Sequence, residues 1–153
     1  CMRVLARLLE APFPLVSLVT GHAFGLGAMV VLASDYSVMR EDRGFFCLPE
    51  VDLSMTLTVR MNELVCSKLN PKAIRAALLT GERLTADRAL ALEVIDATAP
   101  LEQLEEEGLK LASAMMGKNR RSLAGLKRGF NQPIIELIES DEPDGPITSP
   151  GFA

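Results

Sequence analysis

The chain has 153 residues, of which 48% are hydrophobic and 24% are charged. This length and composition predict a single folded domain with a sizeable core, and they exclude a disordered chain. The net charge of −4 leaves no basic surface of the kind that binds nucleic acid. No apolar run approaches the roughly 20 residues of a membrane-spanning helix, so we expect neither nucleic acid nor a membrane span.

The three cysteines, Cys1, Cys47 and Cys66, are odd in number and lack the spacing of a metal site. They predict a reducing compartment, with no disulfide framework and no metal. Cys47 is a candidate nucleophile. Because His22 is the only histidine, a triad with cysteine or serine would have to use it, and a packed or loop histidine is the alternative.

In chain order, the N-terminal part predicts a helix, a strand, a glycine-rich turn and a second helix. Helical spacing over residues 2–9 stops at the prolines within 11–14. The apolar run 14–19 predicts a strand that leads into the turn Gly21–Gly27. Residues 25–33 predict a helix that is apolar on nearly every side and is therefore buried.

Alternation, helical spacing and capping residues predict the elements that follow. We expect two strands around a charged turn, three helices, a short strand, two further helices and a disordered polar tail. The predicted strands are 35–39, 45–48 and the short strand 94–97. The predicted helices are 58–68, 71–79 with Asn70 as its cap, 86–92 with Thr85 as its cap, 100–116 and 120–130. The polar tail is 141–146.

The glycine-rich turn is the first feature that suggests chemistry. Free N–H groups where the next helix begins can face a developing negative charge, and one such donor lowers a reaction barrier by roughly 3 kcal/mol. The alternative is that the glycines only serve a tight strand-to-helix connection. A dinucleotide site is excluded, because Val30 stands where G-x-G-x-x-G requires its third glycine.

About twenty residues further on, Glu50 places a carboxylate after a predicted strand. The alternative to a catalytic role is that Glu50 is a surface carboxylate at the end of that strand. Five segments then stand in a fixed order along the chain: Val19–Ala28 (VTGHAFGLGA), Ser34–Tyr36, Pro49–Leu53, Leu79–Arg83 leading to Ala89, and Val94–Asp96.

This series resembles the crotonase, or enoyl-CoA hydratase/isomerase, superfamily over about residues 12–130. The resemblance implies an α/β fold, the C-terminal part of a crotonase-like ββα spiral with peripheral C-terminal helices. It implies a crotonase-like domain over 1–132, incomplete at its N-terminus, and a helix end with a flexible tail over 133–153. We expect the family's N-terminal strands and a second oxyanion N–H to precede Cys1, and this fragment alone to be inactive.

Hydratases of the family carry two glutamates, and the first of those positions is Met29 here, whose thioether transfers no proton at neutral pH. Glu50 occupies the second. This pattern resembles the delta-3,delta-2-enoyl-CoA isomerases, in which one glutamate removes an α proton from the acyl thioester and returns it at the γ carbon. The implied oxyanion-hole donor is the backbone N–H of Leu26, where family members usually have glycine or alanine.

The implied substrate is an acyl-CoA, with coenzyme A as part of the substrate and no covalently bound cofactor. Substrate contacts are implied for Phe24, Gly25, Gly27, Pro49 and Leu53. The alternatives are a hydratase or another enolate-forming crotonase, and a non-catalytic crotonase-like module for binding or assembly.

Other expectations come from the same resemblance. Lys127 and Arg128 either meet a phosphate or lie on a solvated helix face. The C-terminal helices imply a homotrimer or hexamer. An intracellular location is expected, with peroxisome, mitochondrion and cytoplasm all open. Ser54 and Glu93 replace common glycines, and a left-handed backbone at Glu93 costs on the order of 1 kcal/mol.

Overall fold

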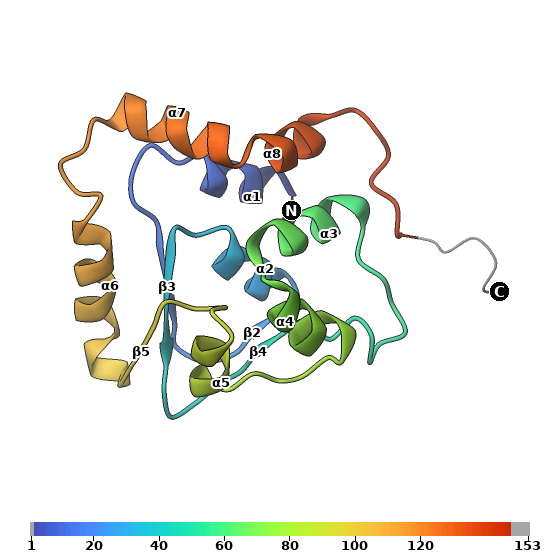
Figure 1. Cartoon of the computed structure of the whole chain (residues 1–153), viewed down its shortest axis with the longest axis horizontal. Coiled ribbons are helices and arrows are strands. Elements are labelled where there is room, and N and C mark those ends of the chain that lie inside the picture. The colour runs from blue at the N-terminus through green and yellow to red at the C-terminus, as the bar shows by residue number, and fades with distance from the viewer. Residues whose placement is uncertain (1, 148–153) are drawn as a thin grey trace.

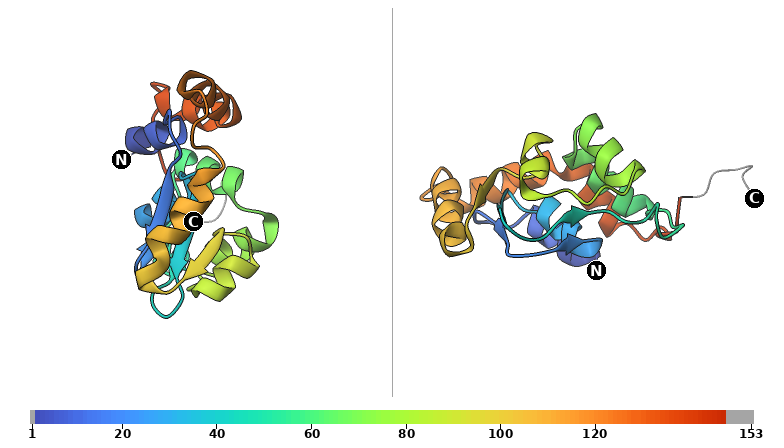
Figure 2. Two further views of the ribbon diagram at one scale, coloured as in Figure 1. Left: turned by 90° about the vertical axis from the view of Figure 1, so that its left-hand side faces the viewer. Right: turned by 90° about the horizontal axis from the view of Figure 1, so that it is seen from below.

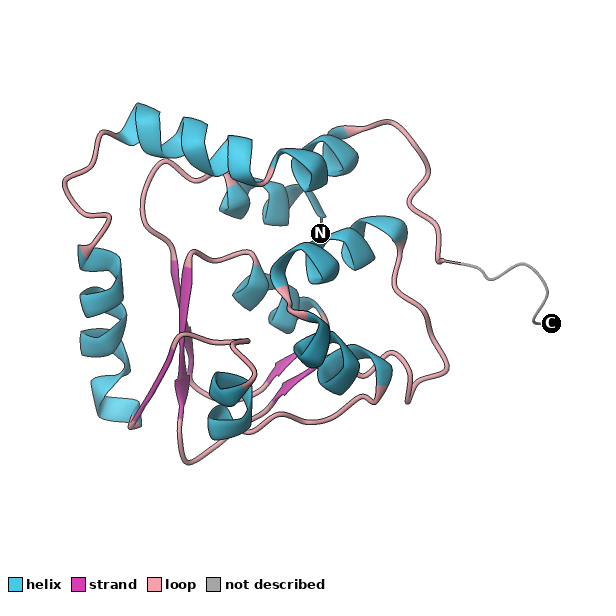
Figure 3. Ribbon diagram, viewed as in Figure 1, coloured by secondary structure: helices cyan, strands magenta, loops and turns pink. Residues whose placement is uncertain are grey.

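The computed structural model describes residues 2–147, and two small parallel sheets organise them (Figure 1). The first sheet has β3 (Tyr36–Arg40) between β1 (Val16–Val19) and β5 (Ala97–Ala99), and the second pairs β2 (Ala23–Phe24) with β4 (Phe46–Cys47). Because every pairing is parallel, the chain must cross over between partner strands, and helices supply most of these connections (Figure 3).

Helices from both ends of the chain form one side of the molecule (Figure 1). They are α1 (Met2–Leu9), α7 (Arg120–Phe130) and α8 (Gln132–Glu139). A separate helix, α6 (Leu104–Ser113), follows the 3₁₀ turn η2 (Leu101–Gln103) and packs against all three strands of the first sheet. Figure 2 shows α6 in front of these strands.

The middle of the chain supplies the helices on the other side of the sheets. They are α2 (Leu26–Leu32), α3 (Val59–Lys68), α4 (Pro71–Ile74), the π-helical turn η1 (Arg75–Leu79) and α5 (Ala86–Ala91). Within residues 2–147, no helix combines the length and apolar character needed to cross a membrane.

Capping side chains begin three of these helices at the expected places. Oδ1 of Asn70 accepts hydrogen bonds from the N–H groups of Lys72 and Ala73, both at 3.0 Å. The hydroxyl oxygens of Thr58 and Thr85 cap α3 and α5 in the same way. Each cap satisfies N–H groups that have no partner inside the helix, so the predicted starts of these helices are confirmed.

Helix α8 belongs to the main hydrophobic core. Ile134, Ile135 and Ile138 are buried together with Leu5 and Leu9 of α1. The helix end expected beyond residue 132 is thus a helix of eight residues whose apolar face packs in the same core as the rest of the chain.

The tail over 141–146, expected to be disordered, is hydrogen-bonded to the start of α3. The C=O of Gly145 accepts from the N–H of Val59 at 3.3 Å, and Oδ1 of Asp144 accepts from the N–H of Arg60 at 3.2 Å. These partners lie more than eighty residues apart along the chain, so local composition gave no sign of them. The rest of the expected flexible tail, 148–153, lies outside the described residues.

Four other elements differ from the expectations. The helix expected over 100–116 is the 3₁₀ turn η2 followed by α6, which ends at Ser113. The strand expected over 94–97 is β5 at 97–99, because Val94 and Ile95 are buried in the core and the pairing with β3 begins at Ala97. The helix expected over 71–79 turns from α to π after Ile74. Helix α2 is buried on one side only, since Leu26 and Val30 are 45% and 36% exposed.

Candidate active site

The register of the second sheet brings the two candidate segments together. Ala23 pairs with Phe46 and Phe24 with Cys47, and the N–H of Gly25 donates to the C=O of Cys47 at 3.1 Å. Because β2 and β4 are parallel, the segments that follow them leave the sheet at the same edge. The start of α2 and the Pro-Glu segment are therefore neighbours, as the sequence predicts.

Gly25 is the N-cap of α2 and makes the turn possible. Its φ of 51° lies in the left-handed region, which glycine adopts without the steric cost of a Cβ. The first bond within the helix runs from the N–H of Met29 to the C=O of Gly25 at 3.1 Å. The N–H groups of Leu26, Gly27 and Ala28 precede this bond and are the ones that a helix start leaves for a ligand or water.

Glu50 follows β4 in a compact turn. The C=O of Glu50 accepts from the N–H of Met55 at 2.9 Å, and the C=O of Pro49 accepts from the N–H of Leu53 at 3.1 Å. One carboxylate oxygen, Oε2 of Glu50, is buried and has no hydrogen-bond partner among the described residues. Glu50 is therefore not a solvated carboxylate at a strand end.

Glu50 lines a cavity of about 290 Å³. The other lining residues come from the turn after Glu50, from α3, from η1 and from the C-terminal segment, and most are apolar: Val51, Met55, Thr56, Leu57, Asn62, Leu78, Leu79 and Ile147. Glu50 is the only charged residue of this set, which from here on we call the Glu50 cavity.

Comparison with known proteins identifies the family. The sequence model of the enoyl-CoA hydratase/isomerase family matches residues 2–140. The chain belongs to the enoyl-CoA hydratase/isomerase family. The predicted crotonase resemblance is thereby confirmed.

Two relatives of this enoyl-CoA hydratase/isomerase family member are plant proteins from Arabidopsis thaliana. The peroxisomal enoyl-CoA delta isomerase 2 is 34% identical over 116 residues, which cover 75% of this chain and 47% of the relative. Enoyl-CoA delta isomerase 3 is 35% identical over 141 residues, which cover 89% of this chain and 59% of the relative. The chain thus spans about half the length of these curated relatives.

Solved structures of the family have the same fold. The apo enoyl-CoA isomerase of Mycobacterium tuberculosis superposes with a TM-score of 0.80 at 26% identity, and an enoyl-CoA hydratase of Mycobacterium ulcerans with 0.80 at 25%. Each match covers 90% of this chain and 60% of the solved chain. The predicted α/β fold of crotonase type is therefore confirmed, although α8, expected on the periphery, packs in the main hydrophobic core.

The substrate contacts that the family resemblance implies fall in different surroundings. Phe24 is 38% exposed, and its ring lies 5.1 Å from that of His22 between centroids. Gly25 and Gly27 form the turn at the start of α2. Pro49 is half-buried beside Glu50, whereas Leu53 is 60% exposed and does not line the Glu50 cavity.

The apolar residues near Glu50 along the chain differ in burial. Phe46 and Leu48 are buried, but Val51 and Leu53 are exposed to 48% and 60%. Val51 lines the Glu50 cavity together with residues that the sequence did not single out, notably Leu57, Leu78 and Ile147. Helical spacing placed Leu78 near the end of a helix, but no local signal indicated that Ile147 returns to this site.

Cys47 is a packed residue of β4. Its side chain is 1% exposed, and its Sγ lies 3.7 Å from the C=O of Gly81, to which the thiol donates. Burial raises the pKa of the Cys47 thiol and so reduces the thiolate that a nucleophile needs. His22 stacks on Phe45 and lies tilted against Phe24. Neither residue therefore supports a catalytic triad: Cys47 is packed in the core, and His22 is an exposed loop histidine that stacks on an aromatic ring.

Lys127 matches neither of the two expectations, whereas Arg128 lies on the solvated face of α7 with its side chain 47% exposed. The Lys127 side chain is buried and pairs with Asp35, while Arg128 pairs with Glu10 and Glu139. The sequence could not show that α7 lies over the start of β3, where Lys127 is buried. The Lys127 ammonium is therefore not free to meet a phosphate.

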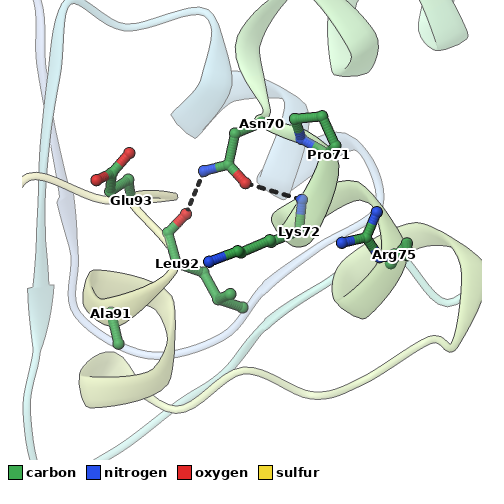
Figure 4. Close-up of a pocket in the computed structure, with 7 residues that line it drawn as sticks. All are labelled: Asn70, Pro71, Lys72, Arg75, Ala91, Leu92 and Glu93. Carbon is green, nitrogen blue, oxygen red and sulfur yellow. Dashed lines mark hydrogen bonds between the residues drawn. The ribbon is translucent and has the colours of Figure 1, made fainter.

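A second cavity, of about 440 Å³, lies between α4 and the end of α5 (Figure 4). Nδ2 of Asn70 donates to the C=O of Leu92 across it at 2.8 Å. Its lining contains none of the expected site residues. Among residues 2–147, no group of three or more His, Cys, Asp or Glu residues is arranged to hold a metal ion.

Proposed function

We propose that the whole protein is an enoyl-CoA delta isomerase, which moves the double bond of a 3-enoyl-CoA to the 2-trans position. The observation that carries this proposal is the buried Oε2 of Glu50, which lacks a partner in the described chain and belongs to a residue that lines a mostly apolar cavity. Buried polar atoms without a partner are rare in folded proteins. If Glu50 is a base that interacts with the substrate, the substrate accounts for the missing partner of Oε2.

The proposed reaction needs only one base. With the thioester oxygen at the N–H of Leu26, Glu50 takes an α proton from the acyl group, and the C–H electron pair moves into a dienolate. An N–H aimed at the developing oxyanion lowers the barrier to this step. Glu50 then returns the proton to the γ carbon, so the double bond moves by one position and the carboxylate is regenerated.

The absence of a second carboxylate favours isomerisation over hydration. A hydratase of the proposed type needs a second acid or base to position water. Met29 is 1% exposed and packed in the core, and α2 contains no acidic residue. Glu50 is also the only carboxylate among the described residues that line the cavity.

Some named relatives support the isomerase proposal, and others carry the names of different acyl-CoA enzymes, such as carnitinyl-CoA dehydratase. Three of them, from Arabidopsis thaliana, are enoyl-CoA delta isomerases, two of these being peroxisomal, and a Rattus norvegicus relative is the mitochondrial enoyl-CoA hydratase domain-containing protein 3. We therefore propose an acyl-CoA substrate and an intracellular location. The proposal does not distinguish the peroxisome from the mitochondrion.

One observation favours a non-catalytic binding module instead. The Leu26 side chain is 45% exposed at the turn where family members usually have glycine or alanine, and it would narrow the approach of a thioester to the N–H. The deciding test gives the whole protein a 3-enoyl-CoA and, separately, a 2-trans-enoyl-CoA. We expect isomerisation to exceed hydration. Faster hydration would indicate a hydratase, and acyl-CoA binding with neither reaction would indicate a binding module.

A further inference from the structure

The C-terminal segment 142–147 returns to the Glu50 cavity. The N–H of Ile147 donates to the C=O of Leu57 at 3.0 Å, and Pro146 forms an antiparallel bridge with Thr58. Figure 1 shows this segment leaving α8 and running past the start of α3. The backbone pairing therefore fixes Ile147 beside Leu57, and both residues line the cavity.

A single side chain of α3 anchors this segment. Nε of Arg60 donates to the C=O of Leu137 at 2.9 Å, and its Nη2 donates to the C=O groups of Ser140 at 2.9 Å and Glu142 at 2.7 Å. Hydrogen bonds from a charged donor are stronger than those between neutral groups. Arg60 thus ties the end of α8 and the segment 142–147 to α3.

The position of Ile147 matters because the cavity is small. Its volume of about 290 Å³ lies at the lower end of the range for small-molecule sites, about 300 to 1,000 Å³. Such a space holds part of an acyl-CoA and not the whole molecule. A branched side chain on its wall therefore limits how much alkyl chain can enter.

We propose that Ile147 is a specificity-determining residue, whose side chain on the wall of the Glu50 cavity limits the length of the acyl chain that the site accepts. This inference rests on the proposed function, because it takes the alkyl part of an acyl-CoA as the occupant. The apolar lining, with Glu50 as its only charge, fits a hydrocarbon chain joined to a group that the carboxylate can deprotonate.

The test compares Ile147→Ala and Ile147→Trp in the whole protein. Affinities for butanoyl-, hexanoyl-, decanoyl- and hexadecanoyl-CoA are measured by calorimetry, and kcat/KM is measured for 3-enoyl-CoAs of matching lengths. A methylene group in a hydrophobic pocket changes discrimination by about tenfold or more. We expect Ile147→Ala to shift the preference toward longer chains by on the order of tenfold, and Ile147→Trp to shift it toward shorter chains.

Two further variants separate the effect of where the segment 142–147 lies from the effect of the size of the Ile147 side chain. Arg60→Ala releases the segment, so it should shift the preference in the same direction as Ile147→Ala. Leu90→Ala is the matched control, because Leu90 is 38% exposed, close to the 39% of Ile147, and does not line the cavity. It should leave the preference unchanged. If Arg60→Ala does not fold, the two Ile147 variants still decide the outcome.

The outcomes distinguish this inference from the proposed function. Isomerisation with the same chain-length preference in both Ile147 variants would overturn the inference and leave the function standing. A shifted binding preference without isomerisation would support the inference and contradict the function. A wild-type protein that binds none of the four acyl-CoAs would overturn the inference.

Discussion

Lys127 of α7 and Asp35, the residue immediately before β3, form a largely buried ion pair. Nζ of Lys127 lies 2.7 Å from Oδ2 of Asp35, and the two side chains are 9% and 17% exposed. The same Oδ2 accepts from the N–H of Leu15 at 2.8 Å, and Nζ donates to the C=O of Phe13 at 3.3 Å. One pair thus joins α7 to the chain segments that lead into β1 and β3.

Removing the cation of this pair should destabilise the fold strongly. Lys127→Met leaves Asp35 buried without its partner, and breaking a buried pair in this way costs about 3 to 5 kcal/mol. Urea unfolding should show this loss in the free energy of unfolding. The control is Lys118→Met, because Lys118 is exposed. Equal stabilities of the two variants would contradict a structural role for the pair.

Replacing the proposed base should abolish isomerisation with little effect on binding. Glu50→Gln keeps the size of the side chain but cannot take a proton, and general acid or base roles are typically worth 10² to 10⁴ in rate. The measurement is the conversion of a 3-enoyl-CoA to its 2-trans isomer by the whole protein. Asp52→Asn, an exposed carboxylate two residues further on, is the control. Undiminished turnover in Glu50→Gln would remove Glu50 from the mechanism.

The glycine turn and the Pro-Glu segment were predictable because each carries a local signal. Gly25 is required by a positive φ at the helix start, and Glu50 follows a short apolar strand. Sequence reasoning also placed them near one another through the resemblance. The parallel register of β2 with β4 then gives the physical reason for that proximity.

The far wall of the site was not predictable from local patterns. Ile147 reaches the cavity through backbone pairing with a segment almost ninety residues earlier, and a polar, proline-broken sequence is typical of disorder. Lys127 gave a similar difficulty. Its helical spacing suggested a solvated face, but tertiary packing buries it against Asp35. Both cases depend on contacts between elements that are distant along the chain.

Thiol labelling should distinguish the two described cysteines. Cys47 is buried and Cys66 is exposed. Because burial raises the pKa of the Cys47 thiol, less of it is thiolate at any given pH, and the thiolate is the reactive form. Iodoacetamide at neutral pH, followed by peptide mass spectrometry, should modify Cys66 much faster. Cys47 should become reactive only when the protein is unfolded, and fast labelling of native Cys47 would contradict its packing.

We propose that the outer face of α7 forms a subunit interface of an oligomer. Leu126 and Phe130 are 73% and 78% exposed on this helix, and apolar groups so placed are typical of an interface when they cluster. We expect the whole protein to be a homotrimer or hexamer and Leu126→Asp to dissociate it, as measured by light scattering after size exclusion. Val4→Asp on α1, at 59% exposure, is the control. A monomeric wild-type protein would contradict this prediction.

Glu93 occupies a backbone position that favours glycine. Its φ is 58°, and it follows α5 in a Schellman arrangement: its N–H donates to the C=O of Leu90, and the N–H of Val94 donates to the C=O of Ala89, both at 2.9 Å. The backbone at Glu93 is therefore left-handed although its side chain carries a Cβ. Its side chain projects beside Leu92 at the mouth of the second cavity (Figure 4).

Glu93→Gly should stabilise the protein. A residue with a Cβ pays a steric cost in the left-handed region that glycine avoids, and part of this gain is offset because glycine makes the unfolded chain more flexible. We expect the free energy of unfolding to rise by about 1 kcal/mol in urea titrations. Glu105→Gly in the first turn of α6 is the matched control, and it should lower that free energy by about 1 kcal/mol, since glycine disfavours a helix. If both variants lose stability alike, the conformation of Glu93 carries no strain.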